Sequence, residues 1–394
     1  MKQKKFLSAY FSKKNLVYPV IFVFFLLLYY LTSAGHTPYD YFTRLADAFI
    51  KGQYFLTDNP PWLNELIPVG NQTFYVVYPP MPAILAIPFR FIFKARFYQE
   101  YLSFLVGAGV AAATFRLARK ISKKVSVATW ITLLTSMGSV VWFLSATGSS
   151  WYLGQLTAMF FVTLALGELF TKKRPFIVGI FLGAAIISRV NLVVIYPFFL
   201  VFLFDKNWKR NFLKLALGSA PFIVFNFYYN FLRFGTIFDR AYYLIPGVLA
   251  EPWYEKGILN LSYIPRHLKV IFWELPKWQN TFPFVKPSWA GLAIWITTPA
   301  FVYALWAPIK KGVVKASWIT ILMVCLIIFS HGTTGFAQFG YRFAVDFYPF
   351  LILLTTVSVT KTGLKWHHWL LLALGITVNL WGVLWINKFG WVGF

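Results

Sequence analysis

The sequence predicts an all-α polytopic membrane protein with about eleven transmembrane helices. Of its 394 residues, 59% are hydrophobic and only 12% are charged, whereas soluble domains are about half apolar and about a quarter charged. Apolar runs long enough to cross a hydrocarbon core of about 30 Å recur along the chain. Its 17 Trp, 22 Tyr and 44 Phe residues suit bilayer interfaces. This composition excludes a soluble globular enzyme and a disordered chain.

Short charged connections separate most of the apolar runs, and we expect a single integral membrane domain over residues 1–394. The polar break Ser188-Arg189-Val190-Asn191 divides one long run. We interpret this break as a tight turn between two spans, with a kink as the alternative. The predicted spans are Leu16–Leu31, Tyr98–Arg116, Val125–Leu144, Tyr152–Phe170, Phe176–Ile187, Leu192–Phe204, Phe212–Leu232, Trp289–Ile309, Ser317–Ser330, Phe343–Val359 and Trp366–Ile386.

The cations predict the orientation of these spans. With the N-terminus inside and Met81–Phe93 lying along the outer surface, the inner segments hold 22 of the 37 Lys and Arg residues but only two of the 12 acids. An excess of Lys and Arg on short inner loops sets the orientation of a membrane protein. We therefore expect a multi-pass protein of the plasma membrane with a cytoplasmic N-terminus. The net charge of +25 then reflects the orientation of the chain and contact of the inner segments with anionic lipid headgroups. We expect no nucleic-acid partner.

The first 34 residues also allow a second interpretation. A Lys-rich start, an apolar run and Thr32-Ser33-Ala34 are compatible with a cleaved signal peptide. The apolar run is long for a signal peptide, so we predict a retained span, and either interpretation leaves the downstream topology unchanged.

A first long outer loop is predicted over residues 33–97. Pro38 suits the first turn of a helix. Asp40, Arg44 and Asp47 follow at i, i+4 and i+7 and form a polar stripe opposite an apolar one. This pattern predicts a juxtamembrane helix lying on the membrane surface.

Three further outer segments carry polar and aromatic residues. Tyr78-Pro79-Pro80 precedes the apolar segment Met81–Phe93, and the prolines predict the start of a second juxtamembrane helix. A second long outer loop covers residues 233–288. The block Gln338–Asp346 forms an outer corner, and the break Ser188-Arg189-Val190-Asn191 forms another.

The sequence contains no motif for a metal, a nucleotide or a cofactor. Cys325 is the one cysteine and lies within a predicted span, so a thiolate cluster cannot form. His367-His368 has no carboxylate at a metal-ligand spacing and begins the last span. We expect neither a metal site nor a cofactor.

This organisation resembles the GT-C superfamily, whose members are multi-spanning glycosyltransferases that use polyprenyl-phosphate-linked sugars. The superfamily includes protein mannosyltransferases and lipid A aminoarabinose transferases of the cell envelope. The resemblance rests on Asp40 at the head of a juxtamembrane helix, Tyr78-Pro79-Pro80, Arg189 and the Gln338–Asp346 block. The chain is most similar to bacterial GT-C proteins of unassigned substrate. It departs from several relatives where Tyr39 replaces a second acid and Tyr78 replaces a lysine.

The resemblance implies a hexosyl- or pentosyltransferase acting at the outer face of the membrane. The donor would be a polyprenyl-phosphate sugar, and the acceptor a hydroxyl of a protein, a lipid or a glycan. Such a reaction needs a base for the acceptor proton and positive charge for the leaving phosphate. The resemblance implies Asp40 as the base, inversion at the anomeric carbon and no metal ion. A helix-terminal Asp that only favours the helix dipole is the simpler alternative.

Further residues are candidates for contact with the substrates. For the donor phosphate they are Arg189, Arg342 and Tyr78; for the acceptor or for support of the site they are His36, Asp47, Arg240, Arg266 and Asp346. Simpler structural roles exist for two of them. Arg189 at an interface can reach the headgroups along its apolar stem. Arg342 and Asp346 are four residues apart, a spacing that predicts a helical ion pair.

A transporter or flippase of a lipid-linked sugar or a small solute is the alternative function. Transporters commonly contain internal repeats and polar groups at the bilayer midplane. The sequence shows no repeat, and its isolated charges gather at the outer ends of predicted spans. These features favour the transferase.

Overall fold

The computed structural model of the chain describes residues 16–391. Lys2, Lys4, Lys5, Lys13 and Lys14, which we predicted to lie inside, are outside the described residues, as is the start of the possible signal peptide. The described chain is mostly helical. Its α-helices are α2 (Val17–Leu31), α3 (Tyr41–Ile50), α4 (Met81–Phe93), α5 (Gln99–Ser122), α6 (Val125–Ser136), α7 (Val141–Thr147), α8 (Ser150–Leu169), α9 (Pro175–Ile186), α10 (Tyr196–Leu203), α11 (Trp208–Phe234), α12 (Ala241–Leu244), α13 (Ile264–Trp273), α14 (Ile294–Thr297), α15 (Gly312–Phe329), α16 (Tyr348–Thr362) and α17 (Trp366–Gly382).

Shorter elements connect these helices. Two antiparallel hairpins pair β1 (Leu66–Pro68) with β2 (Phe74–Val76) and β3 (Lys277–Trp278) with β4 (Val285–Lys286). The 3₁₀ helices are η1 (Lys94–Arg96), η2 (Val190–Ile195), η3 (Val248–Ala250), η4 (Pro252–Tyr254), η5 (Leu261–Tyr263), η6 (Pro299–Trp306) and η7 (Arg342–Asp346), and a π-helical turn, η8 (Val383–Lys388), extends α17.

Five helices among the described residues are long and apolar enough to cross a membrane: α5, α8, α11, α15 and α17 with its π turn. The pair α6 and α7, bent by 55°, gives a sixth if it is one span, and three apolar segments are shorter. The fold therefore confirms a helical membrane protein, while the count of about eleven spans stays a prediction. The predicted span Trp289–Ile309 is not one helix, because α14 ends at Thr297 and Pro299 opens the 3₁₀ helix η6. Proline lacks the amide hydrogen that a continuing helix needs.

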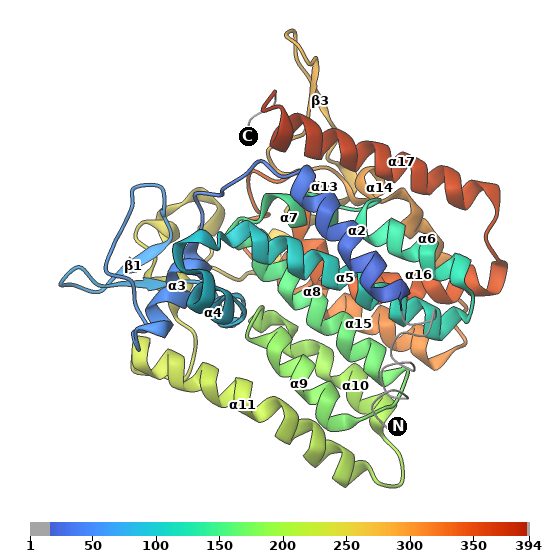
Figure 1. Cartoon of the computed structure of the whole chain (residues 1–394), viewed down its shortest axis with the longest axis horizontal. Helices are drawn as coiled ribbons and strands as arrows, with labels where there is room; N and C mark the ends of the chain where they lie inside the picture. Colours follow the sequence, from blue (N-terminus) through green and yellow to red (C-terminus); the bar gives the residue numbers. More distant parts are fainter. Residues whose placement is uncertain (1–15, 392–394) are drawn as a thin grey trace, which may run out of the picture.

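The spanning helices form a bundle with α5 and α8 at its centre (Figure 1). α5 packs against α2, α6 and α8, while α8 also packs against α9. α17 and α11 lie at opposite edges of the bundle and leave much of their apolar surface exposed. A helix that is apolar on its exposed side fits contact with lipid.

A close backbone contact joins α9 to α11. A Cβ atom added at Gly179 would lie 2.1 Å from the carbonyl oxygen of Leu215, and one added at Gly218 would lie 2.1 Å from that of Phe176. The Ser219 hydroxyl donates to the Gly179 carbonyl across the same contact. Small residues allow such an approach in membrane helices, where packing rather than hydrophobic burial holds helices together.

We expect Gly179→Ala to destabilise the protein by about 1–3 kcal/mol, because the new methyl group meets a backbone carbonyl that cannot rotate away. Thermal unfolding of the purified protein measures the change. Gly167→Ala in α8 is the matched control, since nothing lies within 4 Å of its added Cβ. Equal unfolding temperatures for the two variants would contradict the expected clash.

The first long loop folds into a small unit beside the bundle. α3 packs against α4, and β1 pairs with β2 in the register Leu66 to Val76. The second juxtamembrane helix begins at Met81 as predicted. The first begins at Tyr41, with Asp40 at its N-cap, so the prediction that Pro38 occupies its first turn is wrong. Ser150 and Gln99 both donate to the Tyr39 carbonyl and fix the segment before the helix in a non-helical conformation.

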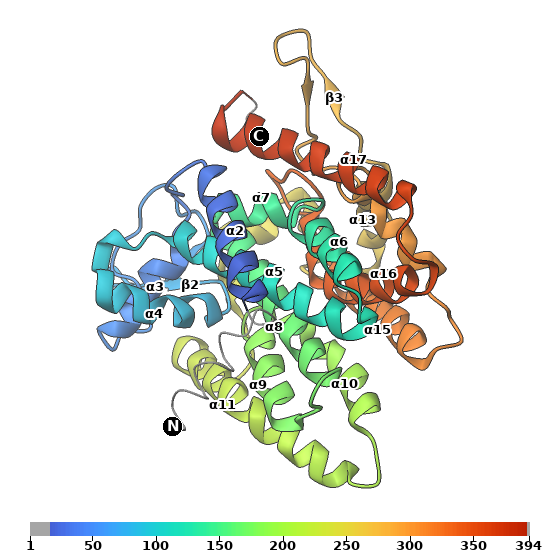
Figure 2. The same ribbon diagram turned by 45° about the vertical axis from the view of Figure 1, so that its right-hand side comes forward.

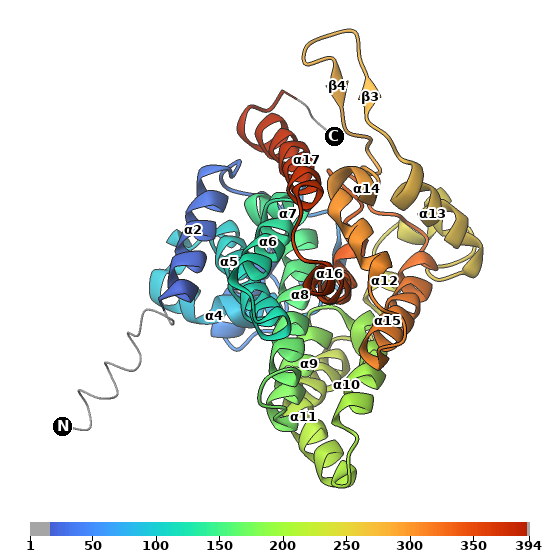
Figure 3. The same ribbon diagram turned by 90° about the vertical axis from the view of Figure 1, so that its right-hand side faces the viewer.

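The second long loop covers the neighbouring surface with α12, α13 and three 3₁₀ turns. It contacts the first long loop through Arg233 at the end of α11, which donates to the Val76 carbonyl at 2.7 Å. The β3–β4 hairpin projects beyond α17 (Figures 2 and 3). At the hairpin tip, the Phe282 ring packs edge-on against Trp391, 5.0 Å away.

Candidate functional site

Two arginines from distant parts of the chain lie near the same aromatic ring; Arg342 is buried, and the Arg189 side chain is 28% exposed. Arg189 follows α9, and Arg342 begins η7. Their guanidinium carbons lie 5.7 and 5.3 Å from the centre of the same ring, that of Phe343. Like charges in a buried place repel each other, so the pair favours an anion between or beside them.

Asp346 neutralises one of the two arginines. Its Oδ2 accepts from Arg189 Nη2 at 2.8 Å and from Asn191 Nδ2 at 2.8 Å. Burial lowers the pKa of Arg189, but the carboxylate of Asp346 outweighs it and the pKa is raised. The helical ion pair that we predicted between Arg342 and Asp346 does not form. Residues 342–346 are a 3₁₀ helix with three residues per turn, so positions four apart point in different directions.

Arg342 keeps its charge without a carboxylate partner among residues 16–391. Its Nε donates to Gln338 Oε1 at 3.2 Å, and its guanidinium lies over the Tyr152 ring at 5.4 Å. Burial lowers the pKa of Arg342, and the nearby charge of Arg189 lowers it further. The side chain is only 8% exposed. The site therefore contains a desolvated positive charge that a bound phosphate would stabilise.

Glu65 adds a carboxylate that we did not predict. It comes from the first long loop, and its Oε2 accepts from the Trp151 indole N–H at 2.9 Å. Burial raises the pKa of Glu65 to about 7, against the Trp151 hydrogen bond and the positive charge of Arg342. No sequence pattern marks Glu65, because only the folded β1–β2 hairpin brings it to Trp151 and within reach of the charge of Arg342.

We expect Glu65→Gln to gain stability over the wild type as the pH rises from 5 to 8. The gain in the free energy of unfolding should be about 1–3 kcal/mol. The pKa in the fold lies above that of an unfolded Glu, so the wild type loses stability as pH rises from about 4.5 to 7. Glutamine keeps an acceptor for Trp151 and removes this loss. Thermal unfolding of both proteins at the two pH values measures the effect. If the variant and the wild type differ in stability by the same amount at both pH values, Glu65 has an ordinary pKa.

Asp40 is linked to this group of residues through its neighbour Tyr39. Its Oδ1 accepts from Arg44 Nε at 2.7 Å, and Arg44 also pairs with Asp58. Oδ2 of Asp40 has no hydrogen bond to any residue that the structure describes, and the side chain is 29% exposed. The neighbouring Tyr39 ring packs on Trp151, 4.6 Å away, and thus connects Asp40 to the surroundings of Glu65.

Tyr78 is buried beside these residues. Its hydroxyl has no hydrogen-bond partner within the described part of the chain, and its ring packs edge-on against Tyr41. The Met81 N–H donates to the Ile187 carbonyl at 3.0 Å, which fixes the Tyr78-Pro79-Pro80 segment near the turn that carries Arg189.

The remaining candidates lie apart from this group. His36 contacts Glu100 and stacks on Tyr98 at 3.5 Å, so it does not orient Asp40. Asp47 accepts from Arg90 Nε at 2.7 Å and joins α3 to α4. Arg240 is exposed at the start of α12. Arg266 donates to the Gly332 carbonyl at 2.7 Å, in a pocket described below. No group of three or more metal-ligating side chains occurs within residues 16–391.

Comparison with known proteins supports the fold. The structure is similar to the crystal structure of ArnT from Cupriavidus metallidurans bound to undecaprenyl phosphate, with a TM-score of 0.55 and 13% sequence identity. The match covers 93% of this chain and 64% of ArnT, so the chain spans less than two thirds of the length of that protein. No family model matches the sequence, and no curated protein matches it.

Proposed function

We propose that the chain is a glycosyltransferase that transfers a sugar from a polyprenyl-phosphate donor to an acceptor hydroxyl. The observation that carries the proposal is the presence of Arg189 and the buried Arg342 at one aromatic ring, where only Arg189 has a carboxylate partner among the described residues. A lipid-linked phosphate would supply the missing anion. The similarity of the fold to ArnT, which was crystallised with undecaprenyl phosphate, supports the same donor class.

The donor phosphate would bind to Arg342, with Arg189 adding a second positive charge. Asp346 and Asn191 position Arg189 from behind through a shared carboxylate oxygen. The unpartnered hydroxyl of Tyr78 would donate to a phosphate or sugar oxygen. In this proposal these groups would face the charge that develops on the leaving phosphate, and buried donors stabilise such charge more than water does.

Asp40 would act as the base. The acceptor oxygen attacks the anomeric carbon in line, its proton passes to Asp40 Oδ2, and the bond from the anomeric carbon to the phosphate oxygen breaks with inversion. Arg44 holds the other carboxylate oxygen and thereby fixes the direction of Oδ2. Asp47 supports the site indirectly, because its pair with Arg90 holds α3 against α4. The proposal needs no metal ion.

The site would face the extracytoplasmic side of the plasma membrane, where the sequence predicts both long loops. The lipid tail of the donor would lie among apolar helices in the bilayer. The sugar is a hexose or a pentose in this proposal.

Purified protein in nanodiscs tests the function directly. Incubation with polyprenyl-phosphate sugars and a membrane extract should release polyprenyl phosphate and add the mass of one sugar to an acceptor. A protein that transfers no sugar but moves the lipid-linked sugar between the leaflets of a vesicle would instead be a transporter or flippase.

A further inference from the structure

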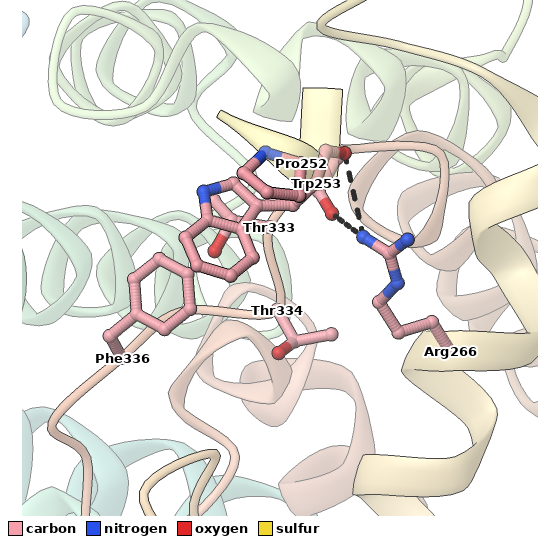
Figure 4. Close-up of a pocket in the computed structure, with 7 residues that line it drawn as sticks. Pro252, Trp253, Arg266, Thr333, Thr334 and Phe336 are labelled. Carbon is pink, nitrogen blue, oxygen red and sulfur yellow. Dashed lines mark hydrogen bonds between the residues drawn. The ribbon is translucent and has the colours of Figure 1, made fainter. Parts of the chain in front are cut away.

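A small pocket lies between the second long loop and the segment that follows α15. Its volume is about 170 Å³, room for one ring-sized group. Trp253, Phe336, Thr333, Thr334 and Arg266 line it. Figure 4 shows Trp253, Thr333 and Phe336 on one side, Arg266 on the other and Thr334 between them.

Two aromatic rings form the apolar wall of the pocket. The rings of Trp253 and Phe336 are 4.8 Å apart and inclined at 55°. The Trp253 indole N–H donates to Glu251 Oε2 at 2.5 Å, which fixes the orientation of its ring. The face of an aromatic ring is negative, so it attracts the slightly positive C–H groups on the face of a sugar ring.

Polar groups surround this wall. Arg266 Nη1 donates to the Gly332 carbonyl at 2.7 Å, and the guanidinium lies over the Tyr263 ring. These two contacts fix the positive charge of Arg266 at the edge of the pocket. Thr334 is 7% exposed, and its hydroxyl, which solvent can reach, makes no hydrogen bond to another residue in the described part of the chain. A site with aromatic walls and a few placed hydroxyl or charged groups suits a ligand with a C–H face and a hydroxyl rim.

One short segment separates the pocket from the phosphate-binding arginine. Gln338 Nε2 donates to the Thr334 carbonyl at 2.9 Å, and Gln338 Oε1 accepts from Arg342 Nε at 3.2 Å. Between them lies Gly335, with φ +86°, where an added Cβ would come 3.1 Å from Arg342 Nε. A ligand in the pocket would therefore lie close to the donor phosphate without occupying its place.

We propose that this pocket binds one sugar ring of the acceptor, a unit next to the one that carries the attacking hydroxyl. The inference rests on the proposed function and makes it more specific, since it identifies the acceptor as a glycan or glycolipid. Arg266, which we predicted as an acceptor contact, takes part in this pocket as a wall residue. A peptide acceptor offers no ring with a C–H face and a rim of hydroxyl groups.

Binding of simple methyl glycosides to the full-length protein in nanodiscs tests the proposal. Saturation-transfer NMR with methyl hexopyranosides and methyl pentosides detects contact of their C–H protons with the protein, and cyclohexanol serves as a non-sugar ring. We expect binding of at least one glycoside, weakened roughly tenfold in Trp253→Leu. Thr334→Val should weaken it as well. Trp278→Leu, at an 84% exposed tryptophan of the β3–β4 hairpin, is the matched control and should bind as the wild type does.

A parallel measurement with polyprenyl phosphate separates this proposal from the proposed function. Trp253→Leu should bind polyprenyl phosphate as tightly as the wild type, which also shows that the variant is folded. Glycoside binding that is equal in Trp253→Leu and Trp278→Leu, or absent from the wild type, would overturn the pocket assignment. Binding of cyclohexanol as tight as that of every glycoside would overturn it too. If the wild type binds a glycoside but not polyprenyl phosphate, the donor assignment is overturned and the saccharide pocket remains supported.

Discussion

Replacement of Asp40 by Asn should lower the rate of sugar transfer by two to four orders of magnitude, while binding of the polyprenyl-phosphate donor changes little. A positioned base contributes about 10²–10⁴-fold to a reaction that removes a proton. Asparagine keeps the size of the side chain and an oxygen for Arg44 but accepts no proton. The rate is measured as release of polyprenyl phosphate at saturating donor.

Asp58→Asn is the control for this variant, because Asp58 pairs with the same arginine and is more exposed, at 54%. If both variants lose activity equally, the loss comes from Arg44 and the start of α3 rather than from a base. If Asp40→Asn transfers sugar at the wild-type rate, Asp40 is not the base, and Glu65, a half-buried carboxylate that feels the charge of Arg342, becomes the residue to test.

Arg342→Gln should weaken binding of the donor by about 10- to 100-fold. Hydrogen bonds to charged groups contribute about 1.5–3 kcal/mol, and this arginine has no carboxylate partner among the described residues that would be left unpaired. Arg342→Lys should recover only part of the loss, since an ammonium group cannot reproduce the planar fork of a guanidinium. The measurement is the dissociation constant for polyprenyl phosphate, together with KM for the donor.

Arg342 gives a cleaner test than Arg189. Removal of Arg189 would leave Asp346 buried without its ion pair, and breaking one partner of such a pair commonly destabilises the fold. Arg210→Gln is the control, because Arg210 is exposed near the start of α11 and has no ion pair among the described residues. An Arg342→Gln protein that binds polyprenyl phosphate like Arg210→Gln would contradict the phosphate site.

The sequence predicts best those features that depend on neighbours along the chain. A charge inside an apolar run marks Arg189 as a turn, and the prolines before Met81 mark the start of α4. The start of α3 was missed by three residues, because hydrogen bonds from Gln99 and Ser150 to the Tyr39 carbonyl fix that segment outside the helix. Such contacts come from helices far along the chain and leave no local pattern.

The partners within the site were the hardest to predict. Asp346 lies four residues from Arg342 but pairs with Arg189, 157 positions away. Glu65 meets Trp151 and the charge of Arg342 only because β1 and β2 fold back toward Trp151. Composition and spacing indicate which charges have to be explained in an apolar chain, but the fold decides which of them meet.

Arg44 has a consequence for repeated turnover. It pairs with Asp40 and with Asp58 at the same time. A proton taken up by Asp40 would remove one negative charge from this trio and leave Arg44 still paired with Asp58. The local charge would then pass between −1 and zero, with no stage at which a cation lacks a partner. The start of α3 would not need to rearrange when the proton arrives or leaves, so the base could be reset by proton exchange with water alone.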